Sequence, residues 1–174
     1  VLAACTPAAT PPAAPEAAAP AAEATETAAA PAPEVAYGQA ATYKIDPTHT
    51  SVTWRVSHLG ISKYTARFKT FDATLQFNPS DLAANSVEVT IDPRSVETDF
   101  QGDYKGTHAD SPYASWNDDL ALNPTWFNAS AHPIITFKST SATQSSPTTG
   151  TVTGDLTFLG VTKPVTLDVT YNGM

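Results

Sequence analysis

Alternation of apolar and polar residues recurs along most of the sequence after residue 43, and this feature restricts the fold more than any other. Val52, Trp54 and Val56 alternate with polar residues, and the same period of two returns in segments 71–77, 87–91, 135–138, 152–158 and 165–171. Such a period places apolar side chains on one face of a strand. Turn-forming segments, such as 78–81 and 159–160, separate the runs. The sequence therefore predicts an all-β fold of successive antiparallel strands, as a barrel or a sandwich.

Two interruptions of this pattern carry structural information. Between residues 64 and 78 the apolar phase slips by one residue at Lys69-Thr70, which is typical of a β-bulge or of a strand bent sharply at a barrel corner. Segment 94–131 lacks the alternation and is broken by glycines and prolines. We expect it to form a long excursion over one end of the sheet, with a helical turn at 118–122.

The first residues of the chain have a different character from the rest. Residues 6–36 consist of Ala, Pro, Glu and Thr with a single Val, and they contain no aromatic and no basic residue. Because this tract has too little apolar area to offset its ordering entropy, it is predicted to be a disordered tether. As a flexible coil it would span about 30 Å, and as a polyproline helix roughly 95 Å.

The short N-terminal segment Leu2-Ala-Ala-Cys5 is similar to the lipobox of bacterial lipoproteins. This similarity predicts a signal-peptide remnant at 1–4, a lipidated Cys5 with its tether over 5–36, and a folded domain over 37–174. The expected location is the bacterial cell envelope, in the periplasm or at the outer membrane. Cys5 is the only cysteine, so the domain has no internal disulfide and depends on its apolar core.

The net charge and the short apolar runs argue against a nucleic-acid-binding protein and against a membrane-spanning helix. The net charge is −8, with nine Lys and Arg scattered along the chain, which does not suit a phosphate backbone and argues against nucleic acid binding. No run approaches the roughly 18 apolar residues of a membrane-spanning helix.

Several motifs resemble the YceI-like family of periplasmic polyisoprenoid-binding proteins. They are the Asp-Pro-Thr-His…His-Leu-Gly block at 46–60, the segment Trp126-Phe-Asn-Ala, the strand Ile135-Thr-Phe-Lys-Ser, and the Gly-Val-Thr-Lys-Pro turn at 160–164. The resemblance implies an extended, lipocalin-like antiparallel barrel of eight strands whose interior holds one isoprenoid lipid, either a polyprenol, a polyprenyl phosphate or a quinone tail. It implies no enzymatic activity and no cofactor.

Family members usually continue beyond the position at which this sequence stops. We therefore expect the chain to be C-terminally truncated, without the strands that close the barrel and with an unsealed sheet edge. The alternative is a natural end at an edge strand.

The apolar face supplies the candidate ligand-binding residues, although periodicity alone fits a filled core equally well. The candidates are Trp54, Val56, His58, Phe68, Phe71, Leu75, Phe77, Val89, Trp126, Phe127, Ile135, Phe137, Leu156 and Phe158. His58 is in phase with the apolar residues of its strand, which fits either a core histidine or a polar contact for a lipid headgroup at the cavity mouth.

Other functions have weaker support in the sequence. Acidic residues and His108 gather in segment 99–119, but no catalytic or metal-ligand spacing is recognisable there, and such acids commonly stabilise turns. A second function class is an accessory that presents a quinone to a membrane cytochrome. A third is a structural or interaction lipoprotein with a filled core and no bound lipid.

Overall fold

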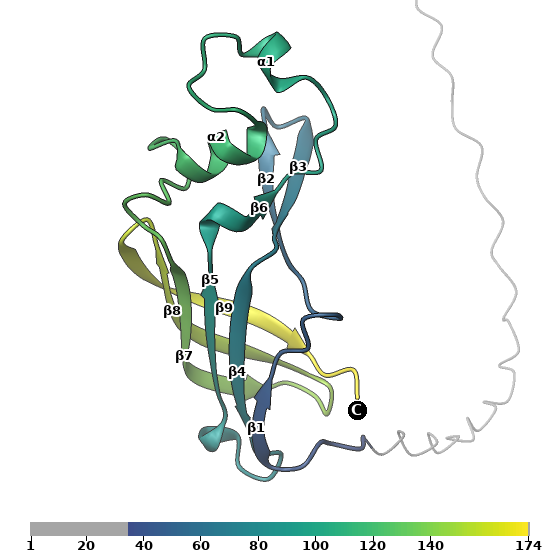
Figure 1. The fold of residues 1–174 in the computed structure, drawn as a ribbon. Helices are drawn as coiled ribbons and strands as arrows, with labels where there is room; N and C mark the ends of the chain where they lie inside the picture. The colour runs from purple at the N-terminus through teal and green to yellow at the C-terminus, as the bar shows by residue number, and fades with distance from the viewer. Residues whose placement is uncertain (1–34, 174) are drawn as a thin grey trace, which may run out of the picture. The chain divides into compact units, whose positions relative to one another are not determined.

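The predicted antiparallel β architecture is present in the computed structural model, which describes residues 35–173 (Figure 1). A six-stranded sheet has the order β1-β4-β5-β7-β8-β9, and a three-stranded sheet has the order β2-β3-β6. The strands of the described residues are β1 (Ala41–Lys44), β2 (Val52–His58), β3 (Ser62–Phe68), β4 (Phe71–Phe77), β5 (Ser86–Ile91), β6 (Val96–Glu97), β7 (Ile135–Gln144), β8 (Thr149–Phe158) and β9 (Val161–Thr170). All pairings are antiparallel.

The phase slip predicted at Lys69-Thr70 is the point at which the chain passes from one sheet to the other. β3 ends at Phe68 and β4 begins at Phe71, and on the neighbouring strand the 3₁₀ turn Pro93–Ser95 separates β5 from β6. Two backbone bonds join the corners: the Lys69 amide donates to the Ser95 carbonyl and the Asp92 amide to the Thr70 carbonyl, each at 3.0 Å.

These corners explain why the described residues contain nine strands although they form only seven continuous stretches of chain; the resemblance implied eight strands in the family, with the last ones missing from this sequence. Two continuous stretches of chain are each divided in two, because residues on either side of a corner pair in different sheets. Neither sheet closes on itself among residues 35–173: β1 and β9 are the edges of the larger sheet, and β2 is an edge of the smaller one.

Segment 94–131 contains the helices and covers one end of the larger sheet (Figure 1). α1 spans Tyr104–Thr107 and α2 spans Trp116–Leu122, so the helical turn predicted at 118–122 is confirmed. Ser115 caps α2, because its Oγ accepts from the Asp118 amide at 3.1 Å. A further 3₁₀ turn, Leu82–Ala84, connects β4 to β5. Within the described residues, the helices are too short and too polar to cross a membrane.

The strand registers place nearly all the apolar side chains on one face of the larger sheet. Phe71 lies opposite Ile91, Ile91 opposite Ile135, and Phe137 opposite Leu156. Thr, Ser and charged residues occupy the other face, as the alternation predicted. The core lies where this face meets α2 and the smaller sheet; its buried members are Ala66, Phe68, Val96, Leu120, Ala121 and Ile135.

Candidate functional site

The apolar face of the larger sheet has a filled end, built around Phe127. The Phe127 ring lies 5.5 Å from Trp54, 5.3 Å from Phe68 and 5.9 Å from Phe158, measured between ring centroids. These rings come from β2, β3 and β8, and Phe127 follows α2, so the cluster joins both sheets to the excursion. The Nε1–H of Trp54 is buried in this cluster without a partner among residues 35–173. This end of the face is therefore filled by packed rings, of which Phe68 is buried and Trp54, Phe127 and Phe158 are partly buried.

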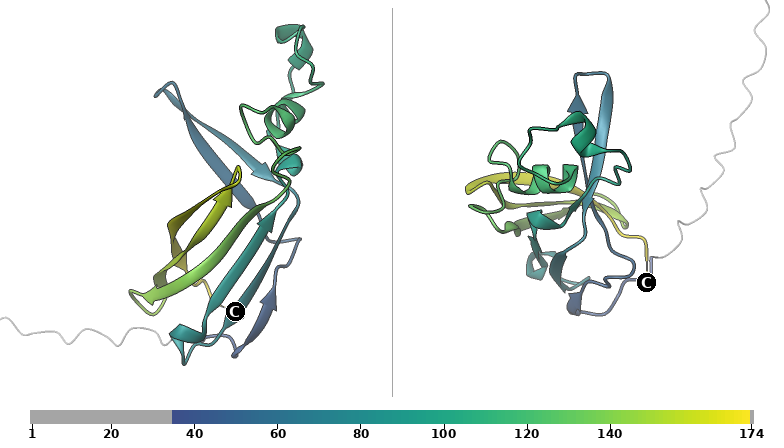
Figure 2. Two further views of the ribbon diagram at one scale, coloured as in Figure 1. Left: turned by 90° about the vertical axis from the view of Figure 1, so that its left-hand side faces the viewer. Right: turned by 45° about the horizontal axis from the view of Figure 1, so that its top comes forward.

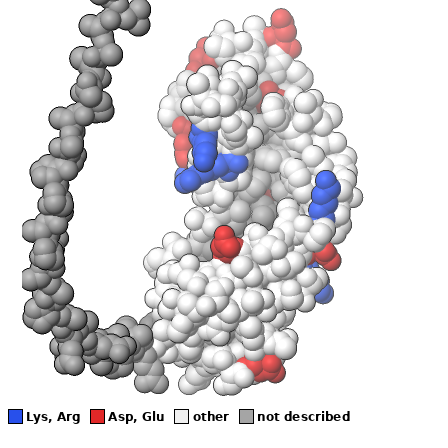
Figure 3. Space-filling model, turned by 180° about the vertical axis from the view of Figure 1, so that it is seen from behind, with Lys and Arg blue, Asp and Glu red and all other residues white. Residues whose placement is uncertain are grey.

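The rest of the same face is open to solvent. Leu75 of β4 is 39% exposed and Leu167 of β9 is 46% exposed, although both side chains belong to the apolar face by register. Seen from behind, the molecule is hollowed at mid-height, with Lys and Arg on both sides of the hollow and an acidic residue at its lower edge (Figure 3). A row of aliphatic side chains in this setting is a surface that an apolar ligand can cover.

Tyrosines close the far end of the open face. The Tyr171 ring stacks on the Phe77 ring, with 6.2 Å between the ring centroids and an angle of 8° between the ring planes. The centroid of the Tyr37 ring lies 5.3 Å from that of Tyr171, and the Tyr43 ring meets the Phe77 ring edge-on. The Tyr171 hydroxyl also accepts from the Gly38 amide at 3.0 Å. The open stretch is therefore bounded at both ends by aromatic rings. β4, with its seven residues, runs along it for about 20 Å.

The structure separates the fourteen predicted residues into three groups. Trp54, Phe68, Phe127, Ile135, Phe137, Leu156 and Phe158 lie at or beside the filled end. Phe71, Leu75, Phe77 and Val89 lie along the remaining part of the face. Val56, His58 and Trp126 are exposed, so His58 is not a core histidine. Cys5 lies outside the described residues.

Sequence reasoning left out four residues that border the open face: Tyr43, Leu167, Val169 and Tyr171. Leu167, Val169 and Tyr171 continue the alternation of their segment, so the signal was present. Lys163 is also unexpected on this face, where it lies opposite Leu156. Its position depends on strand register, which the sequence pattern alone does not specify.

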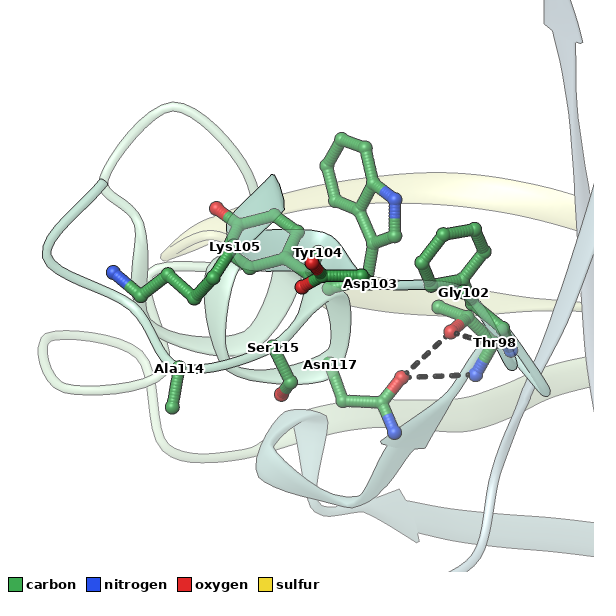
Figure 4. Close-up of a pocket in the computed structure, with 10 residues that line it drawn as sticks. Thr98, Gly102, Asp103, Tyr104, Lys105, Ala114, Ser115 and Asn117 are labelled. Atoms are coloured by element: carbon green, nitrogen blue, oxygen red, sulfur yellow. Dashed lines mark hydrogen bonds between the residues drawn. The ribbon is translucent and has the colours of Figure 1, made fainter. Parts of the chain in front are cut away.

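A second hollow, of about 250 Å³, lies within the excursion and has a polar lining (Figure 4). Asn117 Oδ1 accepts there from the backbone amide and the hydroxyl of Thr98, at 3.0 and 2.8 Å. Nearby, the buried Asp119 accepts from the Tyr104 hydroxyl and the Asn123 side chain, each at 2.7 Å. Burial raises the pKa of Tyr104.

Asp99, Asp118 and Asp119 of the excursion thus have structural partners. Asp99 forms a bidentate pair with Arg67, at 2.8 and 2.9 Å, and Asp118 belongs to the cap of α2. In the described part of the chain, no three His, Cys, Asp or Glu side chains form a group that could hold a metal ion.

Glu97 is the carboxylate with the strongest support in this region. It accepts from Asn117 Nδ2, Lys69 Nζ and the Asp99 amide, each at 3.0 Å, and these bonds, that of Asn117 foremost, lower its pKa to about 2. Because the pKa is lower in the folded protein, this stabilisation is complete above pH 4.5 and is lost as the pH falls towards 2.

We therefore expect Glu97→Gln to lower the unfolding midpoint at pH 7 and to flatten the dependence of stability on pH between about 4.5 and 2. Thermal unfolding across that range measures both effects. Glu88→Gln is the control, since Glu88 pairs with Lys138 on the exposed face and such pairs contribute little. If the unfolding midpoints of the wild type and of Glu97→Gln fell equally as the pH is lowered from about 4.5 to 2, Glu97 would not be the group that causes the acid dependence.

A family model described as the YceI-like domain matches residues 43–174. Protein YceI of Escherichia coli O157:H7 is 38% identical over 136 residues, which make up 77% of this chain and 63% of the relative. A UPF0312 protein of Ectopseudomonas mendocina is 35% identical, over 77% of this chain and 64% of its own length. The chain thus spans less than two thirds of the length of these curated relatives.

Two solved structures also match this chain. The crystal structure of Burkholderia cenocepacia BcnA matches with a TM-score of 0.59 and 28% identity, over 72% of this chain and 70% of that one. The YCEI protein of Campylobacter jejuni matches with a TM-score of 0.50 and 30% identity, over 72% and 66%.

Proposed function

The chain belongs to the family of YceI-like domains, as its motifs predicted, and from this we propose that it binds a long isoprenoid lipid along its open apolar face. At the level of the family, the expected activity is polyisoprenoid binding rather than catalysis. The ligand would be a polyprenol, a polyprenyl phosphate or a quinone tail. Binding would serve sequestration or transport in the bacterial cell envelope, where a lipid on Cys5 would hold the domain close to the membrane that supplies the ligand.

The open stretch of the apolar face is the observation that carries this proposal. Its aliphatic side chains are half-exposed although they point to the same side as the core, and aromatic rings bound it at both ends. An isoprenoid chain that buried about 500 Å² would gain roughly 12 kcal/mol before association and ordering costs. Affinity of this origin requires few polar contacts, in keeping with the largely apolar lining.

Mass spectrometry of lipids extracted from the protein tests the proposal. The protein would be purified without detergent and then incubated with membrane lipids. A stoichiometric prenol, prenyl phosphate or quinone is the expected result, and the headgroup identifies which of the three it is. A bound quinone would favour the alternative function, in which the domain presents a quinone to a membrane cytochrome. A redox-silent prenol would exclude that alternative. An extract that stays empty would leave a structural or interaction module.

A pair of neighbouring substitutions tests the face itself. Leu75→Asp places a carboxylate on the open apolar face, and we expect at least a tenfold loss of affinity for a polyprenol, because the charge must be desolvated when the ligand binds. Gln76→Asp places the same charge on the opposite face of the same strand and should leave binding unchanged. Retention of bound lipid, measured by mass spectrometry on folded protein, compares the two. Equal losses would place the ligand elsewhere.

A further inference from the structure

The hairpin formed by β2 and β3 ends in an apolar tip that is almost fully exposed within residues 35–173. Leu59 is 82% exposed and Ile61 is 84% exposed, and a Cβ placed on Gly60 would have no neighbour within 4 Å. The hairpin projects away from the larger sheet (Figure 2), and its tip lies at the opposite end of the domain from β1 (Figure 1). Two large aliphatic side chains are therefore held in water at the outermost point of a projecting element.

The backbone conformation makes the presence of Leu59 there more informative. Its φ is +53°, and that of Gly60 is +74°, a turn in which Asn, Asp or Gly is normally found at both positions. A leucine is strained in the left-handed region, because its Cβ comes too close to the following carbonyl oxygen. Because Leu59 is 82% exposed, packing within residues 35–173 does little to offset this strain, and a role in an interaction would account for its presence.

The charges around the tip identify the chemistry of the partner. Residues 47–71 contain four of the nine Lys and Arg of the chain and no Asp or Glu, although the net charge of the chain is −8. Arg67 and Lys69, near the base of the hairpin, pair with acids of the excursion. Arg55 and Lys63 lie nearer the tip, on the same face of the hairpin, and form no ion pair within residues 35–173.

We propose that the β2–β3 hairpin docks the domain onto an anionic lipid surface, with Leu59 and Ile61 inserted among the acyl chains and Arg55 and Lys63 at the level of the headgroups. A pointed tip of two aliphatic residues is too small for a stable protein interface, which buries about 800 Å² on each partner. Shallow insertion into a bilayer requires only such a tip, with cations beside it. This inference goes beyond the proposed function, since it concerns another surface and requires no bound isoprenoid.

The structure contains a matched control for this turn. β8 and β9 are joined by Leu159-Gly160, the same dipeptide in the same conformation, with φ of +51° and +73°. Leu159 is half-buried, and a Cβ on Gly160 would lie 2.9 Å from the ring of His132, so this turn is packed where the β2–β3 turn is free. The two leucines share their backbone geometry and differ in exposure.

Vesicle cosedimentation with the full chain tests the proposal, with Cys5→Ser present throughout so that an acyl anchor cannot cause binding. Vesicles of phosphatidylethanolamine with phosphatidylglycerol are compared with vesicles of phosphatidylcholine. We expect binding to the anionic vesicles only, and its loss at 1 M salt, where the Debye length is about 3 Å.

Leu59→Asn is the decisive variant, because asparagine suits the left-handed conformation and should preserve or raise the unfolding midpoint. We expect it to lower vesicle affinity about tenfold or more, and Ile61→Ser to do the same. Arg55→Gln and Lys63→Gln should each cost about fivefold, and Leu159→Asn should change nothing.

Three results would overturn the proposal: binding unaffected by Leu59→Asn, equal losses from Leu59→Asn and Leu159→Asn, or no binding to either kind of vesicle. The last would leave a protein partner as the occupant of the tip. Because vesicle binding and isoprenoid extraction are separate measurements, failure of one does not imply failure of the other.

Discussion

Replacing Phe127 with alanine is expected to lower the free energy of unfolding by about 3 kcal/mol, the lower end of the range for aromatic truncations in protein cores, because the ring is partly buried. The Phe127 ring contacts Trp54 and Phe68 of the smaller sheet and Phe158 of the larger one. Its amide also donates to the Leu120 carbonyl of α2 at 3.0 Å. Removing the ring takes away these contacts at the point where both sheets and the excursion meet.

Urea unfolding followed by far-ultraviolet circular dichroism measures this loss. Trp126→Ala is the matched control: Trp126 is the adjacent residue, but it is 48% exposed, and surface truncations usually change stability by less than about 0.5 kcal/mol. Similar losses for the two variants would show that the cluster around Phe127 does not hold the sheets together.

The second large effect is expected at Gly154, in the middle of β8. An added Cβ would lie 2.5 Å from the carbonyl oxygen of Lys138 and 2.6 Å from the ring of Phe137. The ring packs directly over the glycine, beside the register shift between Ser139 and Ser141 of β7. We expect Gly154→Ala to destabilise the domain by about 1–3 kcal/mol through overpacking, with the upper value more appropriate because one obstacle is backbone.

A double-mutant cycle separates the two obstacles. Phe137→Leu removes the ring but not the Lys138 carbonyl, so combining it with Gly154→Ala should cost less than the sum of the two single changes, by about 0.5–3 kcal/mol. Urea unfolding midpoints of the four proteins, compared at a constant m-value, give the coupling free energy between the two positions. Strict additivity would mean that the ring and the glycine do not constrain each other.

The filled and open parts of the apolar face could not be told apart from periodicity. Phe137 and Leu75 have the same pattern in their strands, yet Phe137 is buried against Gly154 and Leu75 is half-exposed. Alternation specifies the side of a strand to which a residue points, whereas burial depends on what packs across that side. The covering elements are α2 and Phe127, which belong to the segment without alternation, together with Trp54 and Phe68 of the smaller sheet.

His58 and Val56 illustrate the same limit. They are in phase with Val52 and Trp54, and this phase is correct, since all four lie on one face of β2. The outer half of the hairpin nevertheless extends beyond the core, so both are exposed. Their distance from the core follows from the corner at Lys69-Thr70, which turns the smaller sheet away from the larger one.

By itself, the sequence determined the antiparallel β class, the strands and their apolar sides, the corner at Lys69-Thr70, the helical turn at 118–122 and the family. These are local properties: a period of two, a slip in that period, capping residues and short motifs. Only the tertiary structure decided which stretch of the apolar face is open, which rings bound it, and that Leu59 and Ile61 stand free in solvent. These features depend on contacts between segments far apart in the chain, and the pattern within any one segment does not record what is packed against it.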